Sequence, residues 1–132
     1  MHIEFFMPMK VPTTTYQERK LAVRNGKPYT YDPPNVRDTR EKLTAYLSRF
    51  APEREFTGAL RLTVKWLFPR GKSHRDGEYK TTRPDTDNLI KLLKDCMTEL
   101  HFWHDDSQVA SEINEKFHAD ITGIYVKVEE LN

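Results

Sequence analysis

Alternation between apolar and polar side chains marks the strands of this chain. It is clearest in residues 60–68, where apolar residues at even positions alternate with mostly polar residues at odd positions, as in a strand with one buried face. Residues 3–9 are apolar and aromatic and predict a first strand. Residues 108–117 and 122–131 predict two more strands. We expect these last two to form an antiparallel pair that turns at residues 118–121.

Two other segments repeat their apolar residues every three to four positions, as helices do. The first segment has Asn35 as its expected N-cap and Pro52 as its stop. Its apolar stripe consists of Val36, Leu43, Leu47 and Phe50. The second segment has the clearer stripe, made of Leu89, Leu92, Leu93, Cys96, Met97 and Leu100. At about 100° per residue, its opposite face presents Asp87, Asn88, Lys91 and Asp95.

Turn residues punctuate the rest of the chain. Residues 20–23 and 27–31 flank Asn25-Gly26, a pair that supplies the positive φ angles of a two-residue hairpin turn. The flanking residues alternate poorly, which favours a flap outside the main sheet. Residues 69–83 form a stretch that is long for a structureless loop, which indicates function or disorder.

The order strand, hairpin, helix, strand, helix, strand, strand predicts an α+β fold. We expect a mixed, mostly antiparallel sheet with the two helices packed on one face, and residues 1–132 forming a single domain. The chain shows no internal repeats and no linker.

Composition narrows the class of protein without naming a function. Hydrophobic residues make up 37% and charged residues 31% of the 132 residues, as in a globular domain with a charged surface. No apolar run is long enough to cross a membrane, and the first residues lack a signal-peptide pattern. Cys96 is the only cysteine, which excludes an intramolecular disulfide and fits a reducing cytoplasm. We expect Cys96 to pack as a small apolar residue.

The candidate chemistry lies in carboxylates at both ends of the second predicted helix. Asp85 and Asp87 flank one residue at its start, and Asp105 and Asp106 follow its end. Neighbouring carboxylates repel one another unless a cation lies among them, and hard divalent cations prefer oxygen ligands. If the strand after the helix returns beside the helix N-terminus, Asp105 or Asp106 joins the other two. Lys91, one turn into the helix, would then stabilise charge at a reacting phosphate.

Ordinary structural roles remain open for each of these residues. Asp85 or Asp87 can be a helix N-cap, and Lys91 can pair with Asp87 or Asp95 as on any surface helix. Asp105 and Asp106 can form only a turn. The hydrophobic Leu89 stands where an EF-hand calcium loop needs its fifth ligand, so that motif is excluded.

Basic residues concentrate just before the acidic segment. They are Arg70, Lys72, Arg75, Lys80 and Arg83. The formal net charge of the whole chain is only +1, so their clustering matters more than the total. Such a group either faces solvent or contacts a phosphate backbone.

The segments Arg-Pro-Asp-Thr-Asp-Asn-Leu-Ile-Lys (83–91) and Phe-Trp-His-Asp-Asp-Ser-Gln-Val (102–109), with Asp95 between them, resemble the RusA family of Holliday junction resolvases. Members are small homodimeric, Mg²⁺-dependent endodeoxyribonucleases, often carried by prophages. The resemblance implies a RusA-like fold and resolution of four-way junctions by paired phosphodiester hydrolysis that leaves 5′-phosphates, in DNA recombination and repair.

The same resemblance assigns roles to individual residues. It implies that Asp85, Asp87 and Asp106 hold Mg²⁺, with Mn²⁺ able to substitute, and that Lys91 is the catalytic lysine. Asp105 is a reserve ligand, and Asn88 and Asp95 are expected beside these groups. Asp95 matches a recurrent aspartate of the family to which the resemblance assigns no role, and orienting Lys91 is one role open to it. The basic residues 70–83 are expected to bind DNA. Two alternatives stay open: a nuclease for flaps or other branched DNA, and a DNA-binding protein without catalysis.

Overall fold

The computed structural model describes residues 1–13, 20–31 and 34–132. Its main sheet has the strand order β1-β7-β4-β6-β5. The strands are β1 (His2–Met7), β4 (Leu60–Pro69), β5 (Glu78–Tyr79), β6 (Val109–Ala119) and β7 (Gly123–Glu130). Strands β4 and β6 run parallel, and the other neighbours run antiparallel. The expected mixed, mostly antiparallel sheet is confirmed.

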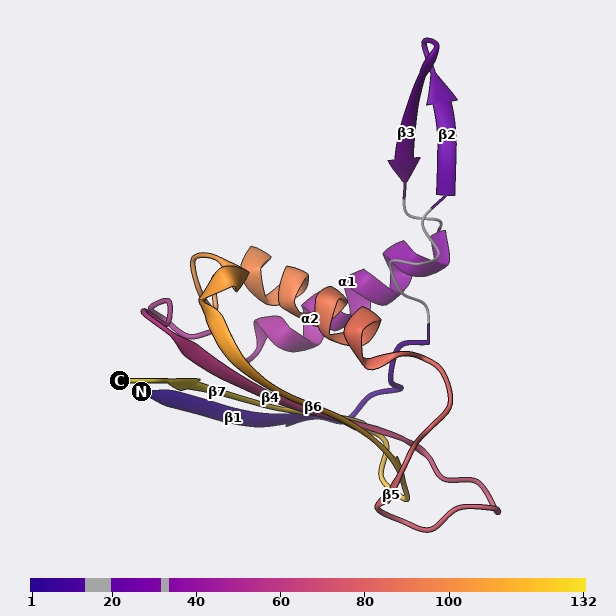
Figure 1. Ribbon diagram of the computed structural model, residues 1–132, viewed down its shortest axis with the longest axis vertical. Coiled ribbons are helices and arrows are strands. Elements are labelled where there is room, and N and C mark those ends of the chain that lie inside the picture. The colour runs from indigo at the N-terminus through magenta and orange to yellow at the C-terminus, as the bar shows by residue number, and fades with distance from the viewer. Residues whose placement is uncertain (14–19, 32–33) are drawn as a thin grey trace.

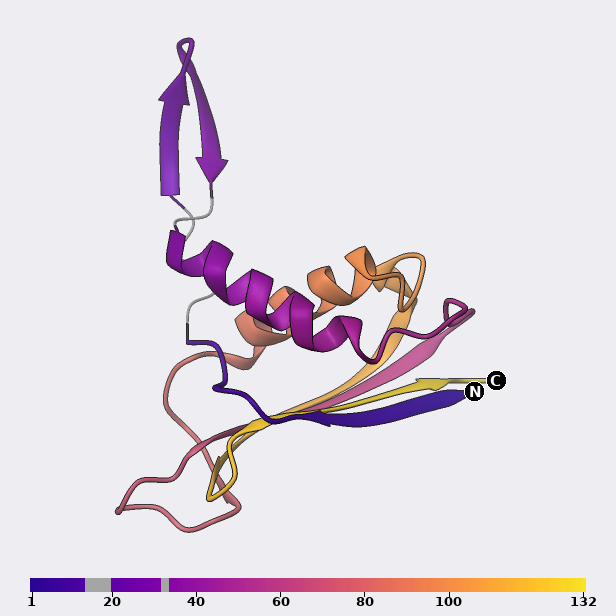
Figure 2. The same ribbon diagram turned by 180° about the vertical axis from the view of Figure 1, so that it is seen from behind.

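Two helices cover one face of this sheet, and no described helix lies on the other face (Figures 1 and 2). They are α1 (Pro34–Ser48) and α2 (Thr86–Glu99), and a short 3-10 helix, η2 (Asp106–Gln108), follows α2. The arrangement confirms the α+β class.

The core lies between α1, α2 and the helix-facing side of the sheet. The even positions of β4 point into it, and Leu60, Leu62, Val64 and Trp66 are fully buried, as the alternation predicted. Helix α2 contributes Leu89, Ile90, Leu92, Leu93, Cys96 and Met97. Burial raises the pKa of the Cys96 thiol, which keeps it protonated and confirms its packing role. None of the helices built from described residues has both the length and the apolar composition to span a membrane.

The expected pairing of the last two strands is wrong. Strand β4 lies between β6 and β7 and hydrogen-bonds to both, so the turn after β6 passes the end of β4. Strand β4 buries one whole face, and a central place gives both of its edges a partner. Sequence proximity suggested a hairpin, but burial of the most apolar strand decides the order.

The start of α1 also differs from expectation. The helix begins at Pro34, so Asn35 lies inside it and is not the N-cap. Proline is favoured at the first helical position because its missing N–H has no partner there in any case and its φ angle already suits a helix.

The hairpin prediction is confirmed. Among the described residues, strands β2 (Lys20–Arg24) and β3 (Lys27–Tyr31) pair only with each other, and the φ angles of Asn25 and Gly26 are 53° and 74°. The hairpin projects from the main body as a separate two-stranded sheet (Figure 1).

Gly123 at the start of β7 generates a stability prediction. A Cβ atom there would lie 2.5 Å from the carbonyl oxygen of Met7 and 2.3 Å from the ring of Phe6, both in β1. We expect Gly123→Ala to lower the free energy of unfolding by about 1–3 kcal/mol, because the strands must separate to admit the methyl group. Denaturant unfolding measures the change.

The control for this prediction is Gly58→Ala. Gly58 has a φ of 71°, and no atom lies within 4 Å of the point where a Cβ atom would stand, so that variant loses only about 1–2 kcal/mol from backbone strain. A smaller loss for Gly123→Ala than for Gly58→Ala would contradict the close approach of β1 and β7.

Candidate active site

Asp85 is the residue that precedes α2, and its backbone is extended, with φ −74° and ψ 145°. Its carbonyl oxygen accepts the first helical hydrogen bond, from Leu89 N at 3.2 Å. Its carboxylate makes no capping hydrogen bond and is exposed. The capping explanation therefore does not account for the Asp85 side chain.

Asp87 and Lys91 follow on the outer face of α2, and both side chains are exposed. We call the N-terminal end of α2 with its two carboxylates, Asp85 and Asp87, the acidic mouth. Asp87 Oδ1 accepts a hydrogen bond from the backbone N–H of Asn88 at 2.9 Å. The positive end of the helix dipole lies at this terminus and favours carboxylates there. Asp95 lies one turn beyond Lys91 on the same face and is half-buried.

Two side chains of β6 brace the segment that carries Asp85, and neither was expected from the sequence. Lys116 Nζ donates to the carbonyl oxygens of Thr82 and Pro84, and Asn114 Nδ2 donates to that of Thr86. Burial lowers the pKa of Lys116, nearby Lys80 lowers it further, and Asp85 opposes the shift. One feature of the sequence could have indicated these two residues. The even positions 112, 114 and 116 of β6 face the helices and are polar, whereas the helix-facing positions of a core strand are usually apolar.

The structure separates Asp105 from Asp106. Asp105 is the N-cap of η2, and its carboxylate accepts the Ser107 N–H at 2.9 Å. The Gln108 side chain returns to the Asp105 N–H at 3.0 Å and completes a capping box. The hydrogen bonds from Ser107 lower the pKa of Asp105. Asp105 therefore has a structural role, while Asp106 is the first residue of η2 and is not its cap.

The acidic groups do not meet within one chain. Trp103, which is fully buried, donates its Nε1–H to Thr98 Oγ1 at 2.7 Å, so the chain that leads to η2 is fastened to the C-terminal end of α2. Helix α2 has 14 residues, about 21 Å at ~1.5 Å per residue. Strand β6 does return to the helix N-terminus, but it arrives there at Asn114 and Lys116.

Asp106 thus lies at the opposite end of α2 from Asp85 and Asp87. Within residues 1–13, 20–31 and 34–132, no group of three or more His, Cys, Asp or Glu side chains is placed to hold a metal ion. The expected meeting of three carboxylates is not found in the single chain, because a whole helix separates the two halves of the motif.

The mouth of α2 nevertheless suits a hard cation. Mg²⁺ usually takes one or two protein carboxylates and keeps several waters for the rest of its shell. Asp85 and Asp87 are two exposed carboxylates at the positive end of a helix. They provide oxygen ligands only, which fits Mg²⁺ or Mn²⁺ better than a soft metal.

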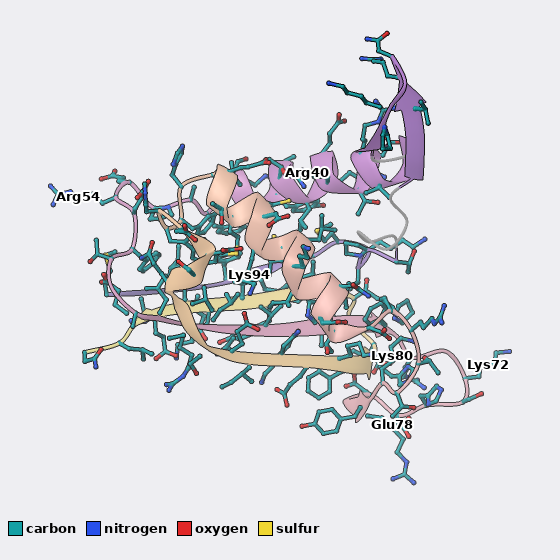
Figure 3. All side chains as sticks on the ribbon, turned by 45° about the horizontal axis from the view of Figure 1, so that its top comes forward. Arg40, Arg54, Lys72, Glu78, Lys80 and Lys94 are labelled. Atoms are coloured by element: carbon teal, nitrogen blue, oxygen red, sulfur yellow. The ribbon has the colours of Figure 1, made fainter. Side chains whose placement is uncertain are left out.

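The basic stretch divides into two groups. Arg70 pairs with Asp120 and donates to the carbonyl oxygens of Gly71 and His74, and Lys80 donates to Thr82 Oγ1 and lies 5.1 Å from the centre of the Phe68 ring. These two hold the loop in place. Lys72, Arg75 and Arg83 are exposed, and Lys72 extends outward from the rim of the loop (Figure 3).

Comparisons with known proteins agree with the motif. The family model described as endodeoxyribonuclease RusA matches residues 2–129. A protein of Lactococcus phage r1t named crossover junction endodeoxyribonuclease rusA is 32% identical over 122 residues, covering 88% of this chain and 92% of the relative. The uncharacterized protein YqaN of Bacillus subtilis (strain 168) is 30% identical over 122 residues, covering 84% and 85%. The chain therefore belongs to the RusA family of endodeoxyribonucleases.

Proposed function

We propose that this endodeoxyribonuclease resolves four-way DNA junctions by Mg²⁺-dependent hydrolysis of one phosphodiester in each of two strands. The observation that carries the proposal is the pair Asp85 and Asp87 at the mouth of α2, exposed and without a capping role for the Asp85 carboxylate. The substrate is supported by the name of the phage relative, crossover junction endodeoxyribonuclease.

The side chains at this mouth divide the chemistry between them. Asp85 and Asp87 hold the divalent ion, which when bound polarises a phosphoryl oxygen and lowers the pKa of a coordinated water. Lys91 lies one turn behind them and neutralises charge that develops on the phosphate or the leaving oxygen. Attack by water at phosphorus with departure of the 3′ oxygen leaves a 5′-phosphate on the product.

A second copy of the chain supplies Asp106 in this proposal. Asp106 lies at the far end of α2 from its own Asp85, so a site with all three acids needs an Asp106 from elsewhere. A two-fold axis across the middle of α2 would set two copies of the helix antiparallel, which brings each η2 to the other copy's Asp85 and Asp87. Such a dimer holds two equal sites, as paired cuts in a symmetric junction require.

Strand β6 offers an edge for this dimer. In the described part of the chain, β5 pairs only with Phe117 and His118 of β6, and Lys80 N donates to the Lys116 carbonyl oxygen at 2.9 Å. The backbone of β6 before Lys116 pairs with β4 alone. An open edge of backbone N–H and C=O groups readily accepts another strand. Antiparallel pairing of two β6 strands near Ser111 would place each Asp106 level with Asn114 to Lys116 of the other copy, where Asp85 lies.

The first test compares cleavage of a labelled four-way junction, a flap and a linear duplex, with Mg²⁺ and with a chelator. We expect wild-type protein to cut the junction only with Mg²⁺ or Mn²⁺ and to leave nicks that DNA ligase seals, since ligase requires a 5′-phosphate. Asp87→Asn should lower the cleavage rate at least about 100-fold, because a metal ligand is removed. Its junction affinity should stay equal or rise, because one repulsive charge near phosphate is gone.

The same cleavage assay also tests the two alternative functions. Cutting of flaps without junctions would favour the nuclease for other branched DNA, and tight binding without cutting in either metal would favour a DNA-binding protein without catalysis. Normal cleavage by Asp87→Asn would overturn the ligand assignment. Glu53→Gln, which changes an exposed carboxylate in the turn before β4, controls for a general charge effect.

Mixed dimers test whether Asp106 acts from the other copy. Asp87→Asn and Asp106→Asn should each be inactive alone, but a mixture that exchanges subunits should recover nicking. In the mixed dimer one site has both substitutions and the other has none, so one strand of the junction is cut. If Asp106 served its own chain, each site would carry one substitution, and the mixture would stay as inactive as either parent.

Salt dependence tests the exposed group of basic residues. The combined variant Lys72→Gln, Arg75→Gln and Arg83→Gln is made in the Asp87→Asn background, which prevents cleavage during the measurement. We expect it to bind the junction more weakly and to flatten the slope of log affinity against log salt by about 0.9 for each phosphate that is no longer neutralised. Lys27→Gln, at the first residue of β3, is the control for net charge. An unchanged slope in the combined variant would remove these residues from the DNA-binding surface.

A further inference from the structure

Side chains of β6 hydrogen-bond to the backbone of the segment that carries Asp85. Lys116 Nζ donates to Thr82 O at 2.6 Å and to Pro84 O at 2.7 Å. Asn114 Nδ2 donates to Thr86 O at 2.9 Å. Two side chains two residues apart on one strand therefore hold the carbonyls of alternate residues 82, 84 and 86. Asp85 lies between the last two fixed points.

We propose that Lys116, with Asn114, is a positioning residue that fixes the Asp85 carboxylate for the divalent ion. The inference rests on the proposed function, since it concerns the same metal site. It assigns to β6 a role in that site in addition to its place in the sheet.

The hydrogen bonds from Lys116 and Asn114 to residues 82, 84 and 86 form a clamp, and its side chains are held in turn by the buried part of the sheet. Asn114 Oδ1 accepts a hydrogen bond from Trp66 Nε1 at 2.7 Å, and Trp66 on β4 is fully buried. Strands β4 and β6 pair in continuous register from Arg61 and Ser111 to Pro69 and Ala119. The amide of Asn114 is thereby oriented by the core, and its donor group is directed at the start of α2. A carboxylate carried on an exposed segment is thus held by the fixed geometry of the sheet.

A lysine at position 116 is an unusual residue for the helix-facing side of a strand. Its side chain is half-buried on the helix-facing side of β6, where an apolar residue would cost less. Lys80 adds a like charge nearby, and Asp85 supplies the opposing one. Lysine offers three donors on a long stem, which lets one side chain reach the carbonyls of both Thr82 and Pro84 just before Asp85.

The positioning role of Lys116 and its positive charge predict opposite effects of its removal on the affinity for a divalent ion. Lys116 is a cation beside a metal ligand, so its charge alone weakens the binding of a second cation. If charge were its whole effect, Lys116→Met would tighten divalent binding. If it positions Asp85, Lys116→Met weakens divalent binding despite the removed charge.

The experiment measures Mn²⁺ binding calorimetrically and amide hydrogen exchange in the metal-free protein, both without DNA. We expect Lys116→Met to raise the Mn²⁺ dissociation constant about 10-fold or more, as removal of groups that orient ligands usually does. Exchange of the Leu89 N–H, which donates to the Asp85 carbonyl oxygen at 3.2 Å, should accelerate in the same variant. Lys116→Arg keeps a charged donor and should retain most of the affinity and protection.

Lys94→Met is the matched control. Lys94 on α2 pairs with Glu112, two residues before Asn114 on β6, so the variant removes a lysine contact between α2 and β6 away from Asp85. It should leave Mn²⁺ binding unchanged. If Lys116→Met does not fold, Lys116→Ala replaces it, since alanine also removes both the charge and the donors.

The outcomes separate this inference from the function beneath it. Equal or tighter Mn²⁺ binding by Lys116→Met, in a wild-type background that binds Mn²⁺ and cuts junctions, overturns the clamp and leaves the function standing. Wild-type protein that neither binds Mn²⁺ nor cuts DNA overturns both. Faster exchange of the Leu89 N–H in Lys94→Met as well would also overturn the inference, because the protection would then not be specific to Lys116.

Discussion

Burial of the apolar face of α2 against the sheet decides where every candidate site residue lies. The stripe from Leu89 to Met97 fixes the rotation of the helix, so the face with Asp87 and Lys91 must look outward. The same burial fixes its direction along β6, with Asp85 near Lys116 and η2 near the start of that strand. The separation of the acids follows from core packing, and no adjustment of an exposed loop would remove it.

The sequence predicted the parts of the structure that local periodicity controls. The stripe on α2, the alternation in β4 and the Asn25-Gly26 turn each depend on residues within a few positions of one another, and each is confirmed. The place of β4 between β6 and β7 was missed, because strand order depends on how much apolar surface each strand must cover and not on its neighbours in the chain.

The candidate site shows the same division. Asp87 and Lys91 lie one turn apart on α2, and Asp85 directly precedes the helix, so the spacing in the sequence brings these three residues to the same end of α2. Asp106 is distant in space although the motif is short, because a whole helix lies between its halves. Lys116 and Asn114 gave no motif signal, since a hydrogen bond from a side chain to a backbone carbonyl leaves no spacing rule in the sequence. Their only trace is polarity on a face that should be apolar.

The strand order also has a consequence for the time at which activity can arise. Strand β1 pairs with β7, and β4 pairs with β6 and β7, so neither early strand of the main sheet has its partner until the last quarter of the chain exists. Contacts so distant in sequence form late. A growing chain on the ribosome therefore lacks the complete sheet against which α2 packs. The acidic mouth is therefore assembled only once synthesis is nearly complete, and an unfinished chain has no ordered site with which to cut DNA.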